Sequence, residues 1–289
     1  MTKHMFAGAL TPYGFVDFFH NILPIEQAKT RFFLKGSSGS GKSTFIKKAA
    51  TEFEARGFKT ERFHCANDAN SLDAVSVPTR GLSIIDATLP HCHDPEIPAS
   101  VDKIIDFAQF LNADKVNQHL SELKSLLHVK KKQSSFVQKE LFKLGQVYNA
   151  EIDSEREMGF KAERALFLSA ITPDGFVTFA DDFFADCKVY DNLPDCEILF
   201  GDQLKIGFLS PFNPDLLEYL YFPDEKTAYR ISKMPNCELF EKELNNTIDT
   251  MQKAKAIHAR IEEIYAEAMD FEKLNVMVEN ILRYLVSMN

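Results

Sequence analysis

The chain has 289 residues, of which 45% are hydrophobic and 12% aromatic, so it can bury one large core or two modest ones. Its formal net charge of -9 disfavours a nucleic acid as the main partner, because lysine and arginine supply most of that binding. No stretch approaches the roughly 20 apolar residues that span a bilayer, and the N-terminus has no secretory pattern, so we expect a cytoplasmic protein. The cysteines lack the paired spacing of disulfides or zinc ribbons, which indicates reduced thiols at Cys65, Cys92, Cys187, Cys196 and Cys237.

The first segment of the chain is repeated in its second half. Residues 6–19 read FAGALTPYGFVDFF and residues 167–180 read FLSAITPDGFVTFA, an offset of 161 (167 − 6). Eight of these fourteen positions are identical, where chance would give about one. We therefore predict an internal duplication, with copy 1 over residues 1–162 and copy 2 over residues 163–289, and a boundary near Glu163.

A glycine-rich loop follows the first predicted strand. Arg31 to Lys35 has the aromatic, β-prone character of a buried strand and runs into the pattern GxxxxGK[ST] and then a helical stretch, Thr44 to Ala55. Glycines at this place let backbone amides approach a β-phosphate, and the helix adds its positive end. We expect Lys42 to reach the phosphate oxygens and Ser43 to bind Mg²⁺. The predicted nucleotide-binding residues are Gly36, Ser37, Ser38, Gly39, Ser40, Gly41, Lys42, Ser43 and Thr44.

A second motif lies further along the chain. A strand predicted over Lys59 to Cys65 is followed by Leu82 to Asp86, a short apolar strand that ends in a carboxylate. This segment resembles a Walker B element, in which the acidic side chain holds the magnesium shell, often through water. We therefore predict Asp86 and Ser43 as magnesium ligands, and Lys42 and Asp86 as catalytic residues.

Polar segments follow two of these strands, at the edge where open α/β sheets bind ligands. Residues 64–73 and 87–93 could orient water or an acceptor substrate through Asp68, Asp73 and His91; turn formation by these residues is the alternative. A zinc ion is disfavoured, because the spacing is not that of a structural site, although suitable ligand types occur at His64, Cys65, His91, Cys92 and His93.

Each copy is predicted to end in long helices. The apolar spacing over residues 120–152 and 244–268 follows steps of three or four, which predicts helical hairpins that pack on each other or on the sheet. A lid or partner-binding arm is the alternative. The run Lys130-Lys131-Lys132 is interpreted as a solvated turn between two helices.

Copy 2 has no glycine-rich loop. Aligning Leu82–Thr88 with Leu204–Ser210 places Phe208 opposite Asp86, so we predict a degenerate, truncated copy that cannot bind nucleotide in the same way. A charge-stabilising arginine is another open point, since no sequence feature selects among Arg80, Arg164 and Arg230.

The combined motifs resemble an uncharacterised group of bacterial proteins labelled ATPase or nucleotide kinase and built from two tandem P-loop copies. The matching pieces are FAGALTPYGFVDF, FFLKGSSGSGKSTFIKK, RGFKTERFHCANDANSLDAV, GLSIIDATLPH and ITPDGFVTF. The resemblance implies an α/β fold of the P-loop NTPase type, an αβα sandwich that binds ATP with magnesium. This chain departs from the pattern where copy 2 lacks its own loop and lysine.

Three functions are consistent with one P-loop. The first is an ATPase whose hydrolysis moves the helices or a protein partner, and the second is a kinase that phosphorylates a small molecule or nucleotide. The third is a non-catalytic ATP-sensing scaffold. In each of these functions the protein could act as an oligomer. The chain lacks the LSGGQ signature of transporter ATPases and an arginine-rich lid, so we favour a different ATPase over the kinase.

Overall fold

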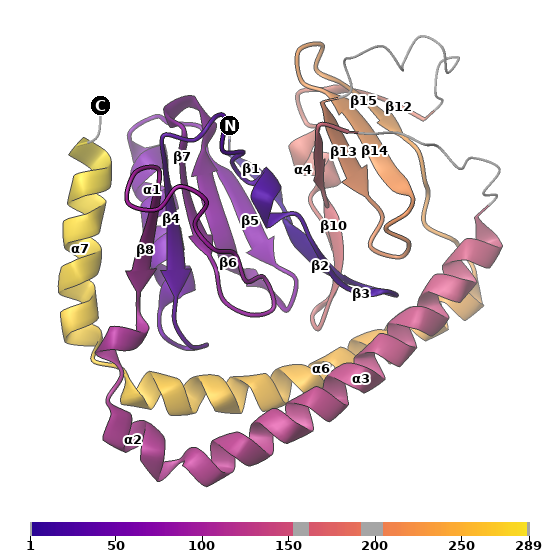
Figure 1. Cartoon of the computed structure of the whole chain (residues 1–289). Helices are drawn as coiled ribbons and strands as arrows, with labels where there is room; N and C mark the ends of the chain where they lie inside the picture. Colours follow the sequence, from indigo (N-terminus) through magenta and orange to yellow (C-terminus); the bar gives the residue numbers. More distant parts are fainter. Residues whose placement is uncertain (1, 153–161, 192–204, 288–289) are drawn as a thin grey trace.

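The computed structural model describes residues 2–152, 162–191 and 205–287 (Figure 1). Two β-sheets face each other, and two long helices run beneath both of them (Figure 1). The predicted boundary near Glu163 follows directly after residues 153–161, which lie outside the described ranges, as does Cys196.

The first sheet belongs to copy 1. Its strands are β1 (Lys3–Met5), β4 (Thr30–Lys35), β5 (Glu61–Cys65), β6 (Asp68–Val77), β7 (Leu82–Asp86) and β8 (Asp102–Asp106). Among the described residues they have the order β1-β5-β6-β7-β4-β8, and β6 alone runs against the others. The predicted α/β class and mostly parallel sheet are confirmed. Residues 64–73, predicted as a polar segment after a strand, are instead mostly strand, because β5 extends to Cys65 and β6 begins at Asp68.

Side chains alternate along β4, so this strand contributes to the cores on both faces of the first sheet. Phe32 and Leu34 pack against helix α1 (Lys42–Ala55), while Phe33 points to the opposite face. On α1, apolar residues recur in steps of three or four and cover this face of the sheet. Helix α7 (Phe271–Ser287) packs on the same face, beside α1.

The opposite face of the first sheet is covered by the second sheet. Phe33, Phe63 and Ile85 share one core with Phe208 and Tyr221 of copy 2. The layers are therefore helix, sheet and sheet, and the arrangement differs from the predicted αβα sandwich, in which helices cover both faces. The apolar face of the second sheet packs on the face that helices would cover in an αβα sandwich.

The second sheet repeats the pairings of the first. Its strands are β9 (Arg164–Leu166), β12 (Lys188–Tyr190), β13 (Ile206–Leu209), β14 (Leu217–Phe222) and β15 (Thr227–Arg230). In the described part of the chain their order is β12-β15-β14-β13-β9, with the same parallel and antiparallel pairs as β4-β7-β6-β5-β1. Copy 2 thus keeps five strands of the sheet of copy 1.

The repeated segments form matching hairpins. The first hairpin pairs β2 (Gly8–Thr11) with β3 (Gly14–Asp17), and the second pairs β10 (Ser169–Thr172) with β11 (Gly175–Thr178) in the same register. Short helical turns follow both hairpins at the same offset of 161, η1 (Phe19–Asn21) in copy 1 and α4 (Ala180–Phe183) in copy 2.

The second alignment made from the sequence is wrong. It set Leu204–Ser210 against Leu82–Thr88, yet β13 pairs in parallel with β9 and so occupies the place of β5. The strand at the place of β7 is β15, and the residue opposite Asp86 is therefore Ile231 rather than Phe208. Short apolar strands resemble one another in sequence, and only their neighbours in the sheet distinguish them.

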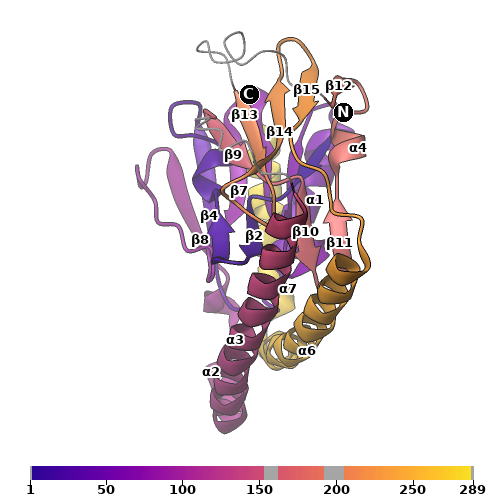
Figure 2. The same cartoon turned by 90° about the vertical axis from the view of Figure 1, so that its right-hand side faces the viewer.

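The long helices pair between copies rather than within them. Helix α2 (Ala113–Gln118) leads into α3 (Leu120–Glu151), which packs antiparallel on α6 (Glu238–Ala268) (Figures 1 and 2). The predicted hairpin within each copy is wrong, and so is the turn at Lys130–Lys132, because α3 is continuous through it. Lys131 and Lys132 are solvated on the outer side of α3, while Lys130 faces α6.

The remaining described helices are the short turns η2 (Pro78–Arg80) and η3 (Ala108–Phe110). None of the helices in the described ranges combines the length and apolar character that crossing a bilayer requires.

Candidate nucleotide-binding site

The nine predicted nucleotide-binding residues are contiguous: Gly36 to Gly41 join β4 to α1, and Lys42 to Thr44 form the start of α1. Gly39 and Gly41 have φ values of +76° and +92°, a region that side chains disfavour. Gly36 is also crowded, since a Cβ there would lie 2.9 Å from the Phe107 side chain and from Ser40 Oγ. Helix α1 begins at Lys42. The first backbone amides of this helix have no partner within it and lie beside the loop, as in an anion-binding site.

Lys42 turns back into this loop. Its Nζ donates to the carbonyl oxygens of Gly36 and Ser37 at 3.1 and 2.8 Å, and it lies 3.6 Å from Asp86 Oδ2. The Lys42 side chain is 6% exposed and the Asp86 side chain 16%. The structure therefore brings together the two residues that the sequence assigned to catalysis, a cation at the start of α1 and a carboxylate at the end of β7, the strand that pairs in parallel with β4.

The two predicted magnesium ligands are held by neighbouring groups. Ser43 Oγ accepts hydrogen bonds from the Leu72 amide at 2.9 Å and from Ser71 Oγ at 3.0 Å, both from β6. Asp86 Oδ1 accepts from the amide and hydroxyl of Thr88. A magnesium ion would need the Ser43 lone pair that Ser71 now uses, and oxygen donors of this kind suit that ion.

A buried acid and a histidine lie next to Asp86. Asp73 Oδ2 is 3.6 Å from His91 Nε2, and His91 Nδ1 donates to the Asp86 carbonyl oxygen at 2.9 Å. Burial raises the pKa of Asp73 to about 6, and Asp86 adds to this effect, whereas His91 and Lys42 oppose it. His91 is stacked on Phe19 at 4.3 Å. Of the acceptor residues suggested by the sequence, Asp73 and His91 meet here, while Asp68 is paired with Lys255 at 3.7 Å.

Three of the potential zinc ligands have different polar partners. His64 contacts His4 at 2.8 Å, His91 contacts Asp73, and His93 contacts Asp17 at 3.1 Å. No group of three or more histidine, cysteine or acidic residues in the described ranges is arranged to hold a metal ion.

Helix α6 lies against the tip of the loop. A Cβ on Gly39 would be 2.4 Å from the carbonyl oxygen of Glu262, so the two backbones are in close contact. One turn earlier, His258 Nε2 is 3.4 Å from Ser38 Oγ, and Lys130 Nζ of α3 donates to His258 Nδ1 at 2.8 Å. Sequence reasoning missed His258 and placed Lys130 in a turn; only the pairing of α3 with α6 brings them to the loop.

The three arginine candidates have other partners. Arg80 lies over the ring of Phe58, and Arg164 forms an ion pair with Glu61 at 2.9 Å. Arg230 donates to Tyr219 Oη. The structure therefore gives none of them a position at the loop.

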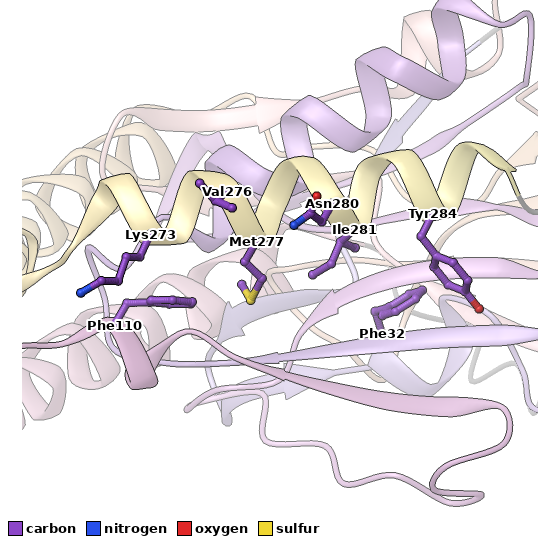
Figure 3. Close-up of a pocket in the computed structure, with 8 residues that line it drawn as sticks. All are labelled: Phe32, Phe110, Lys273, Val276, Met277, Asn280, Ile281 and Tyr284. Carbon is purple, nitrogen blue, oxygen red and sulfur yellow. The ribbon is translucent and has the colours of Figure 1, made fainter.

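Two hollows are relevant to ligand binding. A cavity of about 370 Å³ adjoins the loop through His258 and is bounded by the ends of β5 and β7 and by the helices α3 and α6. A more open groove of about 440 Å³ lies between α7 and the first sheet, with Met277, Ile281 and Tyr284 above Phe32 (Figure 3). The groove lies on the α7 face, so the cavity is the hollow that belongs to the candidate site.

Comparison of the chain with family models, curated proteins and solved structures gave no match. The resemblance to tandem P-loop proteins therefore stays a prediction, and the function must be argued from the residues and their geometry.

Proposed function

We propose that this protein binds a nucleoside triphosphate with magnesium at Gly36–Thr44 and hydrolyses ATP. The observation that carries the proposal is the 3.6 Å separation of Lys42 Nζ and Asp86 Oδ2, beside a loop with positive-φ glycines that joins a parallel strand to a helix. A phosphate tail would replace the loop carbonyls as the partner of the Lys42 ammonium.

Each residue has a role in this proposal. The amides at the start of α1 would bind phosphate oxygens, and Lys42 would neutralise charge on them. Ser43 and Asp86 would hold magnesium, which supplies charge neutralisation at the transferred phosphoryl group. Asp73, which is buried beside Asp86 and in contact with His91, would accept a proton from an attacking water.

The contact with α6 links this site to copy 2. A triphosphate at the loop requires space near Ser38 and Gly39, where His258 and Glu262 now lie. Nucleotide binding therefore displaces this part of α6, and hydrolysis lets it return, which couples the reaction to the helix pair α3 and α6.

The test is magnesium-dependent binding of ATP by calorimetry, followed by phosphate release without any added acceptor. Lys42→Ala removes the buried ammonium and should abolish measurable affinity, whereas Lys48→Ala, on the exposed side of the same helix, should leave it unchanged. Retained affinity in Lys42→Ala would show that the loop is not the nucleotide site. Binding without phosphate release would leave the ATP-sensing scaffold as the better description.

Phosphoryl transfer to a small molecule is the second candidate. The 370 Å³ cavity beside the loop favours it, because it lies at the carboxyl ends of β5 and β7, where α/β sheets bind substrates. Incubation with γ-labelled ATP and a metabolite pool separates the two reactions. Label found only in inorganic phosphate supports hydrolysis, and label in an organic product supports the kinase.

A further inference from the structure

The cavity beside the loop is closed by parts of both copies. The hairpins contribute Leu10, Phe15 and Pro173, the first sheet contributes its loops at Asn67 and at Leu89 and Pro90, and α3 and α6 form the remaining wall. Its volume of about 370 Å³ falls within the range of roughly 300–1,000 Å³ found for small-molecule sites. A ligand here would contact both copies at once.

The charged side chains that line the cavity, among the described residues, are all basic. Among the described residues that line it are Lys130, Lys255 and His258, and none is acidic. Lys255 is already compensated, because its Nζ lies 2.8 Å from Asp174 and 3.7 Å from Asp68.

Lys130 forms no direct ion pair in the described part of the chain, and its Nζ donates to the neutral His258 ring. The carboxylate that acts on Lys130 is that of Glu262, which contacts the same ring, with Oε1 3.6 Å from His258 Nε2. Burial lowers the pKa of Lys130, and burial together with Lys130 lowers the pKa of His258 to about 4. Since His258 Nδ1 accepts from Lys130, its Nε2 carries the proton and points toward Ser38. An anion beside Lys130 would satisfy this buried charge.

The rest of the wall is apolar. Phe15, Val137 and Met251 line it together with Leu10 and Ala254, from the four elements β2, β3, α3 and α6. Polar contacts are supplied by Ser134 and by Gln138, whose amide nitrogen donates to the Thr11 carbonyl oxygen at 3.1 Å. The cavity therefore combines one cationic end with an apolar body.

We propose that this cavity is a binding site for a small molecule with one anionic group, held by Lys130, and an apolar body, held by Phe15, Val137 and Met251. The site is distinct from the P-loop and adjoins it through His258 and Ser38. This inference does not depend on nucleotide binding, because none of its contacts involves a phosphate.

The test uses two probes of one shape, phenylbutyrate and its neutral amide phenylbutyramide, titrated calorimetrically without nucleotide. We expect the acid to bind about tenfold more tightly than the amide, as a charge-assisted hydrogen bond in a partly buried site provides. Equal affinity of the two probes, or binding of neither at millimolar concentration, would overturn the proposal.

Two variants locate the effect. Lys130→Met should remove the preference for the acid and keep the amide affinity, whereas Lys131→Met, the adjacent exposed residue of α3, should keep both. Loss of the preference in Lys131→Met as well would contradict the assignment. Ala254→Phe fills the cavity and should block both probes, with folding checked by circular dichroism.

A measurement on the unaltered protein guards against misfolded variants. The methyl NMR signal of Met251, assigned by Met251→Leu, should shift on addition of phenylbutyrate, and an unchanged signal would place the probe elsewhere. A second titration is made with a non-hydrolysable ATP analogue present. Because nucleotide binding is proposed to displace His258, the analogue should lower the probe affinity to a finite limit, which supports two sites; a loss of affinity that grows without limit as the analogue concentration rises would show that both ligands occupy one site. Failure of the nucleotide site alone leaves the first titration unaffected.

Discussion

The backbones of Phe6 and Phe167 exchange two hydrogen bonds, at 2.9 and 3.1 Å, so that each residue is donor and acceptor to its counterpart in the other copy. Both rings are fully buried, in one cluster with Ala9 and Ala170. The two residues occupy the same position of the repeat, and their pairing joins the two sheets around a local two-fold arrangement.

This arrangement predicts equal effects of equal substitutions. Phe6→Ala and Phe167→Ala should each lower the free energy of unfolding by about 3–5 kcal/mol, because each removes a fully buried ring from the same cluster. Tyr13→Ala, at a side chain that is 61% exposed, should change it little. Urea titration measures all three. A large difference between the two phenylalanine variants would contradict the symmetry.

The contact between the loop and α6 predicts a specific cost at Gly39. Gly39→Ala introduces a side chain at a φ of +76° and places a Cβ 2.4 Å from the Glu262 carbonyl oxygen, so α6 must shift. Gly57→Ala is the matched control, because its φ is +81° and nothing lies within 4 Å of the added atom. Both variants lose about 1 kcal/mol to the backbone conformation, and Gly39→Ala should lose about 1–3 kcal/mol more. Hydrogen exchange should rise in α6 only for Gly39→Ala; equal stability of the two would argue against the contact.

Asp73 is predicted to affect turnover more than binding. If it accepts a proton from the attacking water, Asp73→Asn should lower ATP turnover by about 10²–10⁴ while the nucleotide affinity stays close to that of the unaltered protein. Asp68→Asn, in the partly exposed pair with Lys255, is the comparison and should change turnover little. Phosphate release and calorimetry provide the two readings. Unchanged turnover in Asp73→Asn would exclude this role.

The shifted pKa of the Glu218 carboxyl should make the stability of the protein depend on pH. Burial raises the pKa of this carboxyl to about 7 from an ordinary 4.5, although Ser169 and Arg230 oppose the shift. The folded protein therefore favours the protonated carboxyl, and its contribution is complete below pH 4.5 and lost as the pH rises through 7.

The corresponding variant is Glu218→Gln, which has no proton to lose. Between pH 4.5 and pH values above 7, the free energy of unfolding of the unaltered protein should fall by about 2–3 kcal/mol relative to that of Glu218→Gln. Glu225→Gln, at an exposed residue near the end of the adjacent strand β15, serves as the control. A pH profile of Glu218→Gln that runs parallel to that of the unaltered protein would contradict the assignment.

Local sequence patterns were sufficient to predict the elements whose structure is determined by their own residues. The strand before Gly36, the apolar strand that ends at Asp86 and the helix after Lys42 lie where the sequence predicted them. The hairpins of the repeat also form at the identical segments. In each case a short run of residues carries both the periodicity and the turn chemistry.

The errors arose where distant neighbours decide the structure. The first part of β6 is polar, with Asp68, Asn70 and Asp73, and forms a strand because it pairs with β5 at Asp68 and Leu72. Lys130 lies in a continuous helix because α6 of the other copy packs on α3. No local signal marks His258 or Glu262 as neighbours of the loop, because their place depends on how the two copies meet.

The helix over the loop of copy 1 originates in copy 2. A chain cut between the copies would leave the phosphate loop in one fragment and Glu262 and His258 in the other. The first fragment would then lack the helix that now covers Ser38 and Gly39, and the two fragments would have to reassociate to restore that contact. The two related halves therefore form one unit, in which a helix of copy 2 covers the glycine-rich loop of copy 1.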